Sequence, residues 1–210
     1  MTDTERSLPM NRRPAYLEID DLLCYVAEPN RERCQILLQE NRRLFETTPG
    51  STHNHQAWPG GYIDHITDGM NLAVHLYRFM ESFGRPLPFT LSDALLIFFL
   101  HDLEKPWRIV VGADGAHNKP GLDTKEAFKK FREKQLEKYG IELTPAQHNA
   151  LTYVEGEYKD YSSKRRVMNE LAAFCHLVDT WCARGWYNYP LSGDEDPWDG
   201  AGRFRLASAA

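Results

Sequence analysis

The chain has 210 residues, enough for one folded domain with short extensions, and 42% of them are hydrophobic, enough for a buried core. Its net charge of −5 argues against stable binding of duplex nucleic acid, because proteins that do so are usually basic. No apolar run approaches the roughly 18 residues of a membrane span, and the polar N-terminus lacks a secretory signal. The four cysteines form no Cys-x-x-Cys pair, so we expect a reduced, cytoplasmic protein without a membrane span.

Hydrophobic residues recur at helical spacing along most of the chain, which predicts an all-α fold of about seven helices. These helices would form a single domain over residues 15–189. The flanking segments, 1–14 and 190–210, are rich in Pro, Gly, Ser and charged residues, so we expect a flexible N-terminal tail and a poorly ordered C-terminal tail. The predicted helices span residues 16–27, 30–47, 62–83, 91–104, 122–139, 145–156 and 165–184.

Two capping boxes mark the starts of helices. Thr90 and Thr144 are followed three residues later by Asp93 and Gln147, so each pair can satisfy backbone N–H groups at a helix N-terminus. Between these two positions, a β-branched run is followed by an Asp-Gly pair. This pattern predicts a small hairpin or flap near residues 107–117.

Two carboxylates are expected to point into the core. Residues 94–100 read ALLIFFL, a helix that is apolar on every side, and they lead directly into His101-Asp102. Asp179 lies on the apolar stripe of the last predicted helix, four residues after Cys175. Buried carboxylates need partners, and two of them repel each other unless a cation lies between them. The pattern leaves two alternatives open: His101-Asp102 at a helix end that simply reaches the surface, and an Asp179 bonded to a backbone amide or an Arg.

His65 completes a set of four candidate metal ligands. It follows a Pro-Gly-Gly turn near the start of its predicted helix, where a histidine by itself is more often a surface or capping residue. Together with His101, Asp102 and Asp179 it supplies two imidazoles and two carboxylates. This mixture suits one divalent ion such as Mn, Fe, Co, Ni or Zn. Mg, a hard ion that prefers oxygen ligands, is a further alternative.

Three ordered motifs resemble the H…HD…D signature of the HD-domain metal-dependent phosphohydrolase superfamily. They are Gly-Gly-Tyr-Ile-Asp-His at 60–65, Leu-His-Asp-Leu-Glu-Lys at 100–105 and His-Leu-Val-Asp-Thr at 176–180. The segment His-Gln-Ala-Trp-Pro-Gly-Gly at 55–61 is also similar to the lead-in of HD-domain exoribonucleases, with Gln56 where that lead-in has a second histidine. The resemblance covers roughly residues 53–184 and is nearest to exoribonuclease-like and nucleotidase-like members.

The resemblance implies an HD-domain helical bundle that binds one or two divalent ions and hydrolyses phosphoesters. It places Lys105 where related members have a lysine that could contact phosphate, although Glu104 replaces a glycine of that motif. His55 is a candidate general acid in the loop before the third predicted helix, and simple solvent exposure is the alternative. The resemblance also assigns four metal ligands, of which Asp102 belongs to the catalytic centre as well: His65, His101, Asp102 and Asp179.

A single metal is favoured because the extra histidines of dinuclear members are missing. Val154-Glu155-Gly156 stands where those members often have His-His-Gly, and no histidine lies near Lys125-Glu126. Glu155 and His148 share a helix face, which keeps a second metal open as an alternative.

The predicted function is hydrolysis of a phosphoester of a nucleotide or short oligonucleotide by metal-activated water. The expected partner is therefore a small phosphorylated substrate. Two other classes remain open: a catalytically silent HD module that binds a nucleotide or a protein partner, and an HD-type di-iron oxygenase, which would need further histidine ligands.

Overall fold

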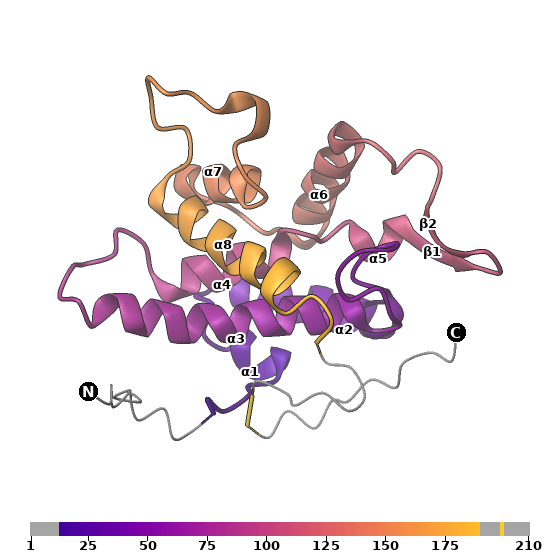
Figure 1. Cartoon of the computed structure of the whole chain (residues 1–210), viewed down its shortest axis with the longest axis horizontal. Coiled ribbons are helices and arrows are strands. Elements are labelled where there is room, and N and C mark those ends of the chain that lie inside the picture. Colours follow the sequence, from indigo (N-terminus) through magenta and orange to yellow (C-terminus); the bar gives the residue numbers. More distant parts are fainter. Residues whose placement is uncertain (1–12, 190–197, 200–210) are drawn as a thin grey trace, which may run out of the picture.

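The computed structural model of the chain describes residues 13–189 and 198–199 (Figure 1). Helices dominate these residues, as the sequence predicts, and one small antiparallel strand pair accompanies them. In chain order the elements are α1 (Ile19–Leu23), α2 (Asn30–Thr47), α3 (Gly61–Glu81), α4 (Leu91–Leu100), α5 (Lys105–Arg108), β1 (Ile109–Gly112), β2 (Gly115–Asn118), α6 (Lys125–Tyr139), α7 (Pro145–Tyr153), the 3-10 turn η1 (Tyr158–Asp160), α8 (Glu170–Thr180) and the π-helical turn η2 (Trp181–Gly185).

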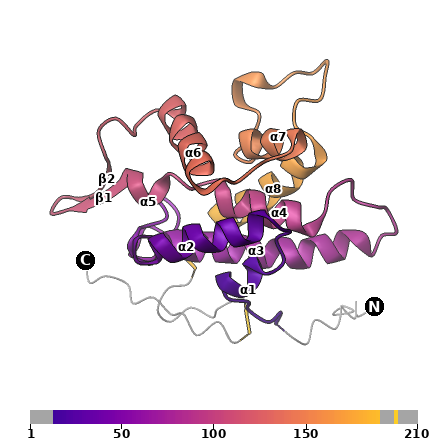
Figure 2. The same cartoon turned by 180° about the vertical axis from the view of Figure 1, so that it is seen from behind.

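Helices α3, α4 and α8 pack together at the centre of the fold. In both views α3 crosses the molecule, α1 lies on one side of it, and α6 and α7 stand on the other side (Figures 1 and 2). Every residue of the run 94–100 in α4 is at most 2% exposed, which confirms the prediction of a helix buried all round. Gly69 allows α3 to approach α4 closely, since a Cβ at this position would lie 1.9 Å from the ring of Phe98.

The predicted capping boxes are confirmed. The hydroxyl of Thr90 accepts a hydrogen bond from the backbone N–H of Asp93, and the same contact joins Thr144 and Gln147. The predicted flap is also found, because β1 and β2 form a hairpin in which Ile109 pairs with Asn118.

Several predicted helix boundaries are wrong, and side-chain caps explain two of the differences. The helix expected at 122–139 begins at Lys125 because Thr124 caps it. The helix expected at 165–184 begins only at Glu170, because the Asn169 side chain accepts the backbone N–H of Ala172. The basic residues 164–166 therefore do not lie in that helix.

Three other predicted helices are too long. The first is limited to α1, and the one expected at 145–156 ends at Tyr153. The helix expected at 91–104 ends at Leu100, after which His101–Glu104 form a turn that leads into α5.

Residues near the two ends of the described part of the chain contact each other and helix α3. Trp198 is 3% exposed and its Nε1 donates a hydrogen bond to Asp68 Oδ1 at 2.9 Å. Ala15 and Asp199 form a parallel β-bridge. The predicted tails otherwise lie outside the described residues, apart from residues 13–14, which the structure includes. Among the described helices, none has the length and apolarity needed to cross a membrane.

Candidate metal centre

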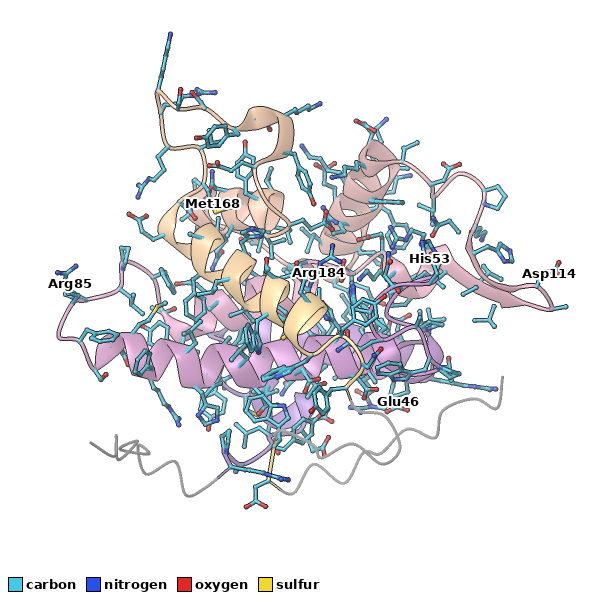
Figure 3. The ribbon with its side chains drawn as sticks, in the orientation of Figure 1. Glu46, His53, Arg85, Asp114, Met168 and Arg184 are labelled. Carbon is cyan, nitrogen blue, oxygen red and sulfur yellow. The ribbon has the colours of Figure 1, made fainter. Side chains whose placement is uncertain are left out.

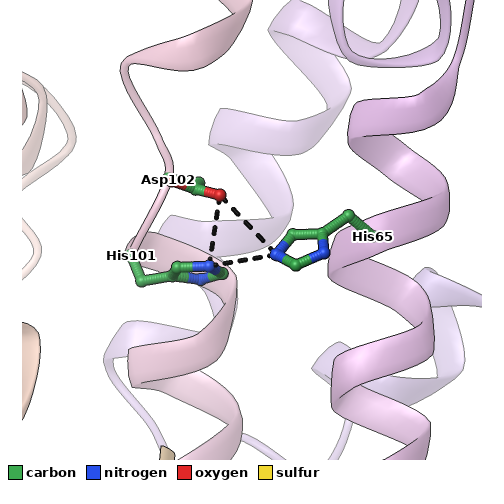
Figure 4. A group of neighbouring side chains, drawn as sticks. All are labelled: His65, His101 and Asp102. Atoms are coloured by element: carbon green, nitrogen blue, oxygen red, sulfur yellow. Dashed lines mark hydrogen bonds and ion pairs between the residues drawn. The ribbon is translucent and has the colours of Figure 1, made fainter. Parts of the chain in front are cut away.

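Three helix ends bring the predicted ligands together. His65 lies near the start of α3, His101 and Asp102 follow the last residue of α4, and Asp179 lies near the end of α8. His65 is fully buried, and His101 and Asp102 are 1% and 3% exposed. Figure 4 shows the first three side chains directed at a common point between α3 and the end of α4.

The donor atoms of these side chains lie within a few ångströms of one another. The Nε2 atoms of His65 and His101 are 3.3 Å apart. Asp102 Oδ2 lies 3.2 Å from His101 Nε2 and 3.6 Å from His65 Nε2. Asp179 Oδ1 lies 3.2 Å from His65 Nε2 and 3.5 Å from His101 Nε2. Two carboxylates therefore flank a pair of facing imidazoles, and all four predicted ligands meet.

The hydrogen bonding of His101 shows that this point attracts positive charge. Its Nδ1 is 2.6 Å from the carbonyl oxygen of Phe98, which can only accept, so Nδ1 carries a proton and Nε2 of the neutral ring presents a lone pair. That lone pair faces carboxylate oxygens. Burial lowers the pKa of His101, but Asp102 and Asp179 outweigh it and raise the pKa to about 10. The site therefore favours a cation at Nε2.

A divalent ion fits this donor set. Imidazole nitrogens and carboxylate oxygens bind such ions at roughly 2.0–2.2 Å, which places neighbouring ligand atoms about 3.0–3.6 Å apart. The four distances between His65 or His101 and a carboxylate, and the one between the two imidazoles, run from 3.2 to 3.6 Å. The buried group of His65, His101 and Asp102 could thus hold a metal ion, with Asp179 beside it.

Lys105 lies beside the four candidate ligands, and its ammonium is directed at a carboxylate. Nζ is 2.5 Å from Asp102 Oδ2, and the residue is only 7% exposed. Burial raises the pKa of Asp102, yet Lys105 and His101 outweigh it and hold that pKa well below its usual value.

Sequence reasoning missed Arg132, which braces the centre from α6. Its Nη1 donates hydrogen bonds to the backbone oxygen of His101 and to Glu104 Oε2, each at 3.1 Å. Glu104 is 1% exposed and also lies 3.7 Å from Arg108 Nη1. A buried glutamate in place of the motif's glycine was a signal that a cation lies nearby, but helical spacing alone does not identify which helix supplies it.

His55 lies over the centre. Its ring centroid is 5.1 Å from that of His65, and its buried Nε2 has no hydrogen-bond partner within the described residues. Burial, with smaller contributions from His65 and Lys105, lowers the pKa of His55 to about 3, so the imidazole is neutral at pH 7. Because Nε2 is buried, the alternative that His55 is simply exposed to solvent does not hold for this atom.

Backbone contacts hold the loop that carries His55. The carbonyl of Gln56 lies against Gly61, where a Cβ would come within 1.8 Å of the oxygen, and it accepts a hydrogen bond from Gly50 N at 2.9 Å. Gln56 N donates to the carbonyl of Tyr187 at 3.1 Å. The Gly-Gly turn noted in the sequence thus makes room for the loop.

Glu155 and His148 line a cavity of about 500 Å³ between α6, α7 and residues 154–160. Loss of solvent around Glu155, together with the nearby Asp102 carboxylate, raises the pKa of Glu155. The cavity therefore adjoins the metal centre through Glu155 and also through Arg132, which lines it as well.

A scan of protein-family models finds no family that matches the chain, and searches of curated proteins and of solved structures find no significant match. What is established is a mostly helical fold with a buried cluster of two histidines and an aspartate at metal-binding distance.

Proposed function

We propose that this chain is a metal-dependent phosphohydrolase of the HD superfamily that cleaves a phosphoester of a nucleotide or short oligonucleotide. The observation that carries the proposal is the pair of imidazole Nε2 atoms, 3.3 Å apart and flanked by two carboxylates, one next to His101 in the chain and one on α8. The order of the motifs along the sequence and their places at three helix ends support the same assignment.

His65, His101, Asp102 and Asp179 would hold one divalent ion. Such an ion supplies a Lewis acid and an activated water for attack at phosphorus. Lys105 supplies a buried ammonium at the same centre, and it can neutralise a phosphoryl oxygen when it turns from Asp102. His55 supplies a neutral imidazole above His65, so it does not act as the predicted general acid at pH 7, and its unpartnered Nε2 can instead accept a hydrogen bond from water or the substrate.

A catalytically silent binding module is the second candidate, and one contact favours it. The ammonium of Lys105, 2.5 Å from Asp102 Oδ2, already provides a positive charge to the cluster. In a chain that binds no metal, this ammonium could compensate the negative charge of the buried carboxylates and so allow the site to fold. Metal content separates the two candidates, because only the phosphohydrolase needs the ion.

Elemental analysis and turnover test the proposal together. We expect about one equivalent of a transition metal per chain, retained on dialysis, because four protein donors converge on one point. We also expect hydrolysis of bis(p-nitrophenyl) phosphate or nucleotides in at least one of Mn, Co, Ni and Mg. Protein that retains no metal and hydrolyses none of these compounds with any of the ions would favour the silent module. Two retained equivalents would contradict the single-metal assignment.

A further inference from the structure

The cavity beside the metal centre has the dimensions and walls of a nucleoside site. Its volume of about 500 Å³ is within the usual range for small-ligand pockets. Phe128 and Tyr158 give it aromatic walls, and the Nζ of Lys125 rests 3.5 Å from the centroid of the Tyr158 ring. Glu155 gives it a carboxylate, an acceptor for sugar hydroxyls, on the side that adjoins Asp102. A planar base could take the place of the ammonium on the Tyr158 ring.

The outer wall of the cavity continues into a projecting segment, residues 156–168, which we name the arm. It rises beyond α7 and returns to α8 next to Met168, in Figure 1 and in the labelled view of Figure 3. Two tyrosines of the arm are largely exposed, Tyr158 by 63% and Tyr161 by 69%. Exposed rings of this kind are platforms on which unpaired bases stack.

Basic residues outnumber acidic ones in the two elements that flank the cavity, although the residues that line it include five acidic and four basic ones. The arm has four basic and two acidic residues and α6 has six basic and three acidic residues, although the chain as a whole carries −5. Arg166 pairs with Glu170, whereas Lys159, Lys164 and Arg165 make no ion pair within the part of the chain that the structure describes. These three side chains are free to meet phosphates.

We infer that the cavity and the arm together bind a short single-stranded oligonucleotide. One nucleoside lies in the cavity against Tyr158, and the following phosphates and bases run along the arm past Tyr161 and Lys164-Arg165. Cleavage of this ligand rests on the proposed function, but its binding does not. A duplex is excluded as the ligand because its bases are stacked on each other and offer no face to the tyrosines.

The proposed binding site for the oligonucleotide runs from the metal centre, through the cavity, to the arm. Arg132 and Glu155 line the cavity, and Arg132 Nη1 donates a hydrogen bond to the backbone oxygen of the candidate ligand His101 at 3.1 Å, so this end of the cavity adjoins the metal centre. Tyr161 and the basic residues 164–166 line a second, shallower hollow farther along the arm. The phosphate next to the nucleoside in the cavity is therefore the one that faces the metal centre.

Fluorescence anisotropy with the metal-loaded protein tests the inference. The probes are fluorescein-labelled oligouridylates of about two to eight nucleotides with phosphorothioate linkages, which slow hydrolysis at the phosphate itself. We expect affinity to rise with length over the first few nucleotides and to fall with salt between about 50 and 200 mM. Uridine monophosphate that competes as well as the hexanucleotide, or polyglutamate that competes equally, would overturn the inference.

Two variants and two matched controls locate the binding. Tyr158→Leu should weaken hexanucleotide binding about 5- to 150-fold, the usual effect of losing a stacked base. Phe83→Leu is its control, because Phe83 is 65% exposed but lies in the α3–α4 connection.

The double variant Lys164→Gln with Arg165→Gln should reduce the slope of log affinity against log salt concentration by about 1.4, roughly 0.7 per lost phosphate contact. The double variant Arg78→Gln with Arg85→Gln removes two exposed charges elsewhere (Arg85 is labelled in Figure 3) and should leave the slope unchanged.

The outcomes separate this inference from the proposed function. Protein that binds the hexanucleotide through Tyr158 but hydrolyses no phosphoester overturns the function and leaves the inference standing. Protein that hydrolyses bis(p-nitrophenyl) phosphate but binds the hexanucleotide no differently after the arm substitutions overturns the inference alone.

Discussion

The Nε2 atoms of His65, on α3, and His101, in the turn after α4, face each other at 3.3 Å although the two residues are 36 positions apart in the chain. Each of these atoms also lies within 3.6 Å of Asp102 and of Asp179. Neutral imidazoles and ionised carboxylates cannot all satisfy one another here, so the cluster requires a proton or a metal ion. The predictions about the site follow from this requirement.

Asp179→Asn should lose the metal while the fold persists. The change keeps the shape of the side chain but removes one negative charge and one donor of the set. We expect metal affinity to fall by more than about 100-fold, beyond the effect usual for residues that only support a ligand, and hydrolysis to fall with it. Chelator competition and elemental analysis measure the first effect. Glu170→Gln, an exposed carboxylate of the same helix, is the control. Unchanged metal content in Asp179→Asn would show that the residue is structural.

Lys105→Ala should leave the metal in place and slow turnover. Its ammonium contacts Asp102 and lies where a phosphoryl oxygen would develop charge. We expect kcat/KM to fall about 10- to 100-fold, on the order of 1.4–2.7 kcal/mol of transition-state stabilisation. Lys119→Ala, an exposed lysine after β2, should have no effect. Wild-type kcat/KM in Lys105→Ala would remove this lysine from the proposed mechanism.

His55→Ala should lower kcat and preserve metal content, because the imidazole lies 5.1 Å from the His65 ring, centroid to centroid, with its Nε2 free within the described residues. Loss of a group that positions water or substrate can cost about 100-fold. Steady-state kinetics and elemental analysis on the same preparation measure both effects. His53→Ala changes an exposed histidine of the same loop and should behave as wild type. Equal losses in the two variants would mean that the loop, not the imidazole, matters.

The cysteines provide a test that is independent of the site. Cys24 is exposed, whereas Cys34 is buried, and burial raises the pKa of the Cys34 thiol to about 12. At pH 8 roughly one Cys34 in ten thousand would therefore be a thiolate, and this fraction grows tenfold per pH unit up to the pKa. We expect Ellman's reagent to modify one thiol quickly in the native protein and the others only after unfolding. Fast modification of two or more native thiols would contradict the burial of Cys34, Cys175 and Cys182.

Gly69→Ala should destabilise the fold, although alanine favours helices. The new Cβ would meet the Phe98 ring at 1.9 Å, in the contact between α3 and α4. Overpacking of a core usually costs about 1–3 kcal/mol, more than the roughly 1 kcal/mol that alanine gains over glycine inside a helix. Denaturant unfolding measures the difference. Gly112→Ala, on the exposed hairpin, should change stability much less, since its nearest neighbour is the His117 side chain at 3.3 Å.

Local signals in the sequence were sufficient for much of the fold. The capping boxes at Thr90 and Thr144 and the Asp-Gly turn of the hairpin each depend on residues a few positions apart. The start of α8 was misplaced by five residues, because hydrophobic periodicity continues through 165–169 while the Asn169 cap determines where helical hydrogen bonds begin.

The candidate ligands were also identifiable, because burying Asp102 and Asp179 is unfavourable unless something compensates their charge. The residues that brace them were not. Arg132 reaches the His101 carbonyl from α6 and, outside the metal centre, Trp198 reaches Asp68 on α3 from 130 positions away. Contacts of this kind depend on how helices pack, which no spacing within one helix encodes.

Because of the contacts that Trp198 and Asp199 make, the end point of an expressed fragment affects the folded domain. A fragment that stops at residue 189 would retain the described helices but would lose an indole N–H from the buried Asp68 and a ring that contacts His75 and Trp186. It would also lose the backbone pairing of Asp199 with Pro14 and Tyr16, so the first described residues would lose their neighbour. Deletion mapping that follows helix boundaries would therefore weaken α3, which carries His65, without touching a single ligand.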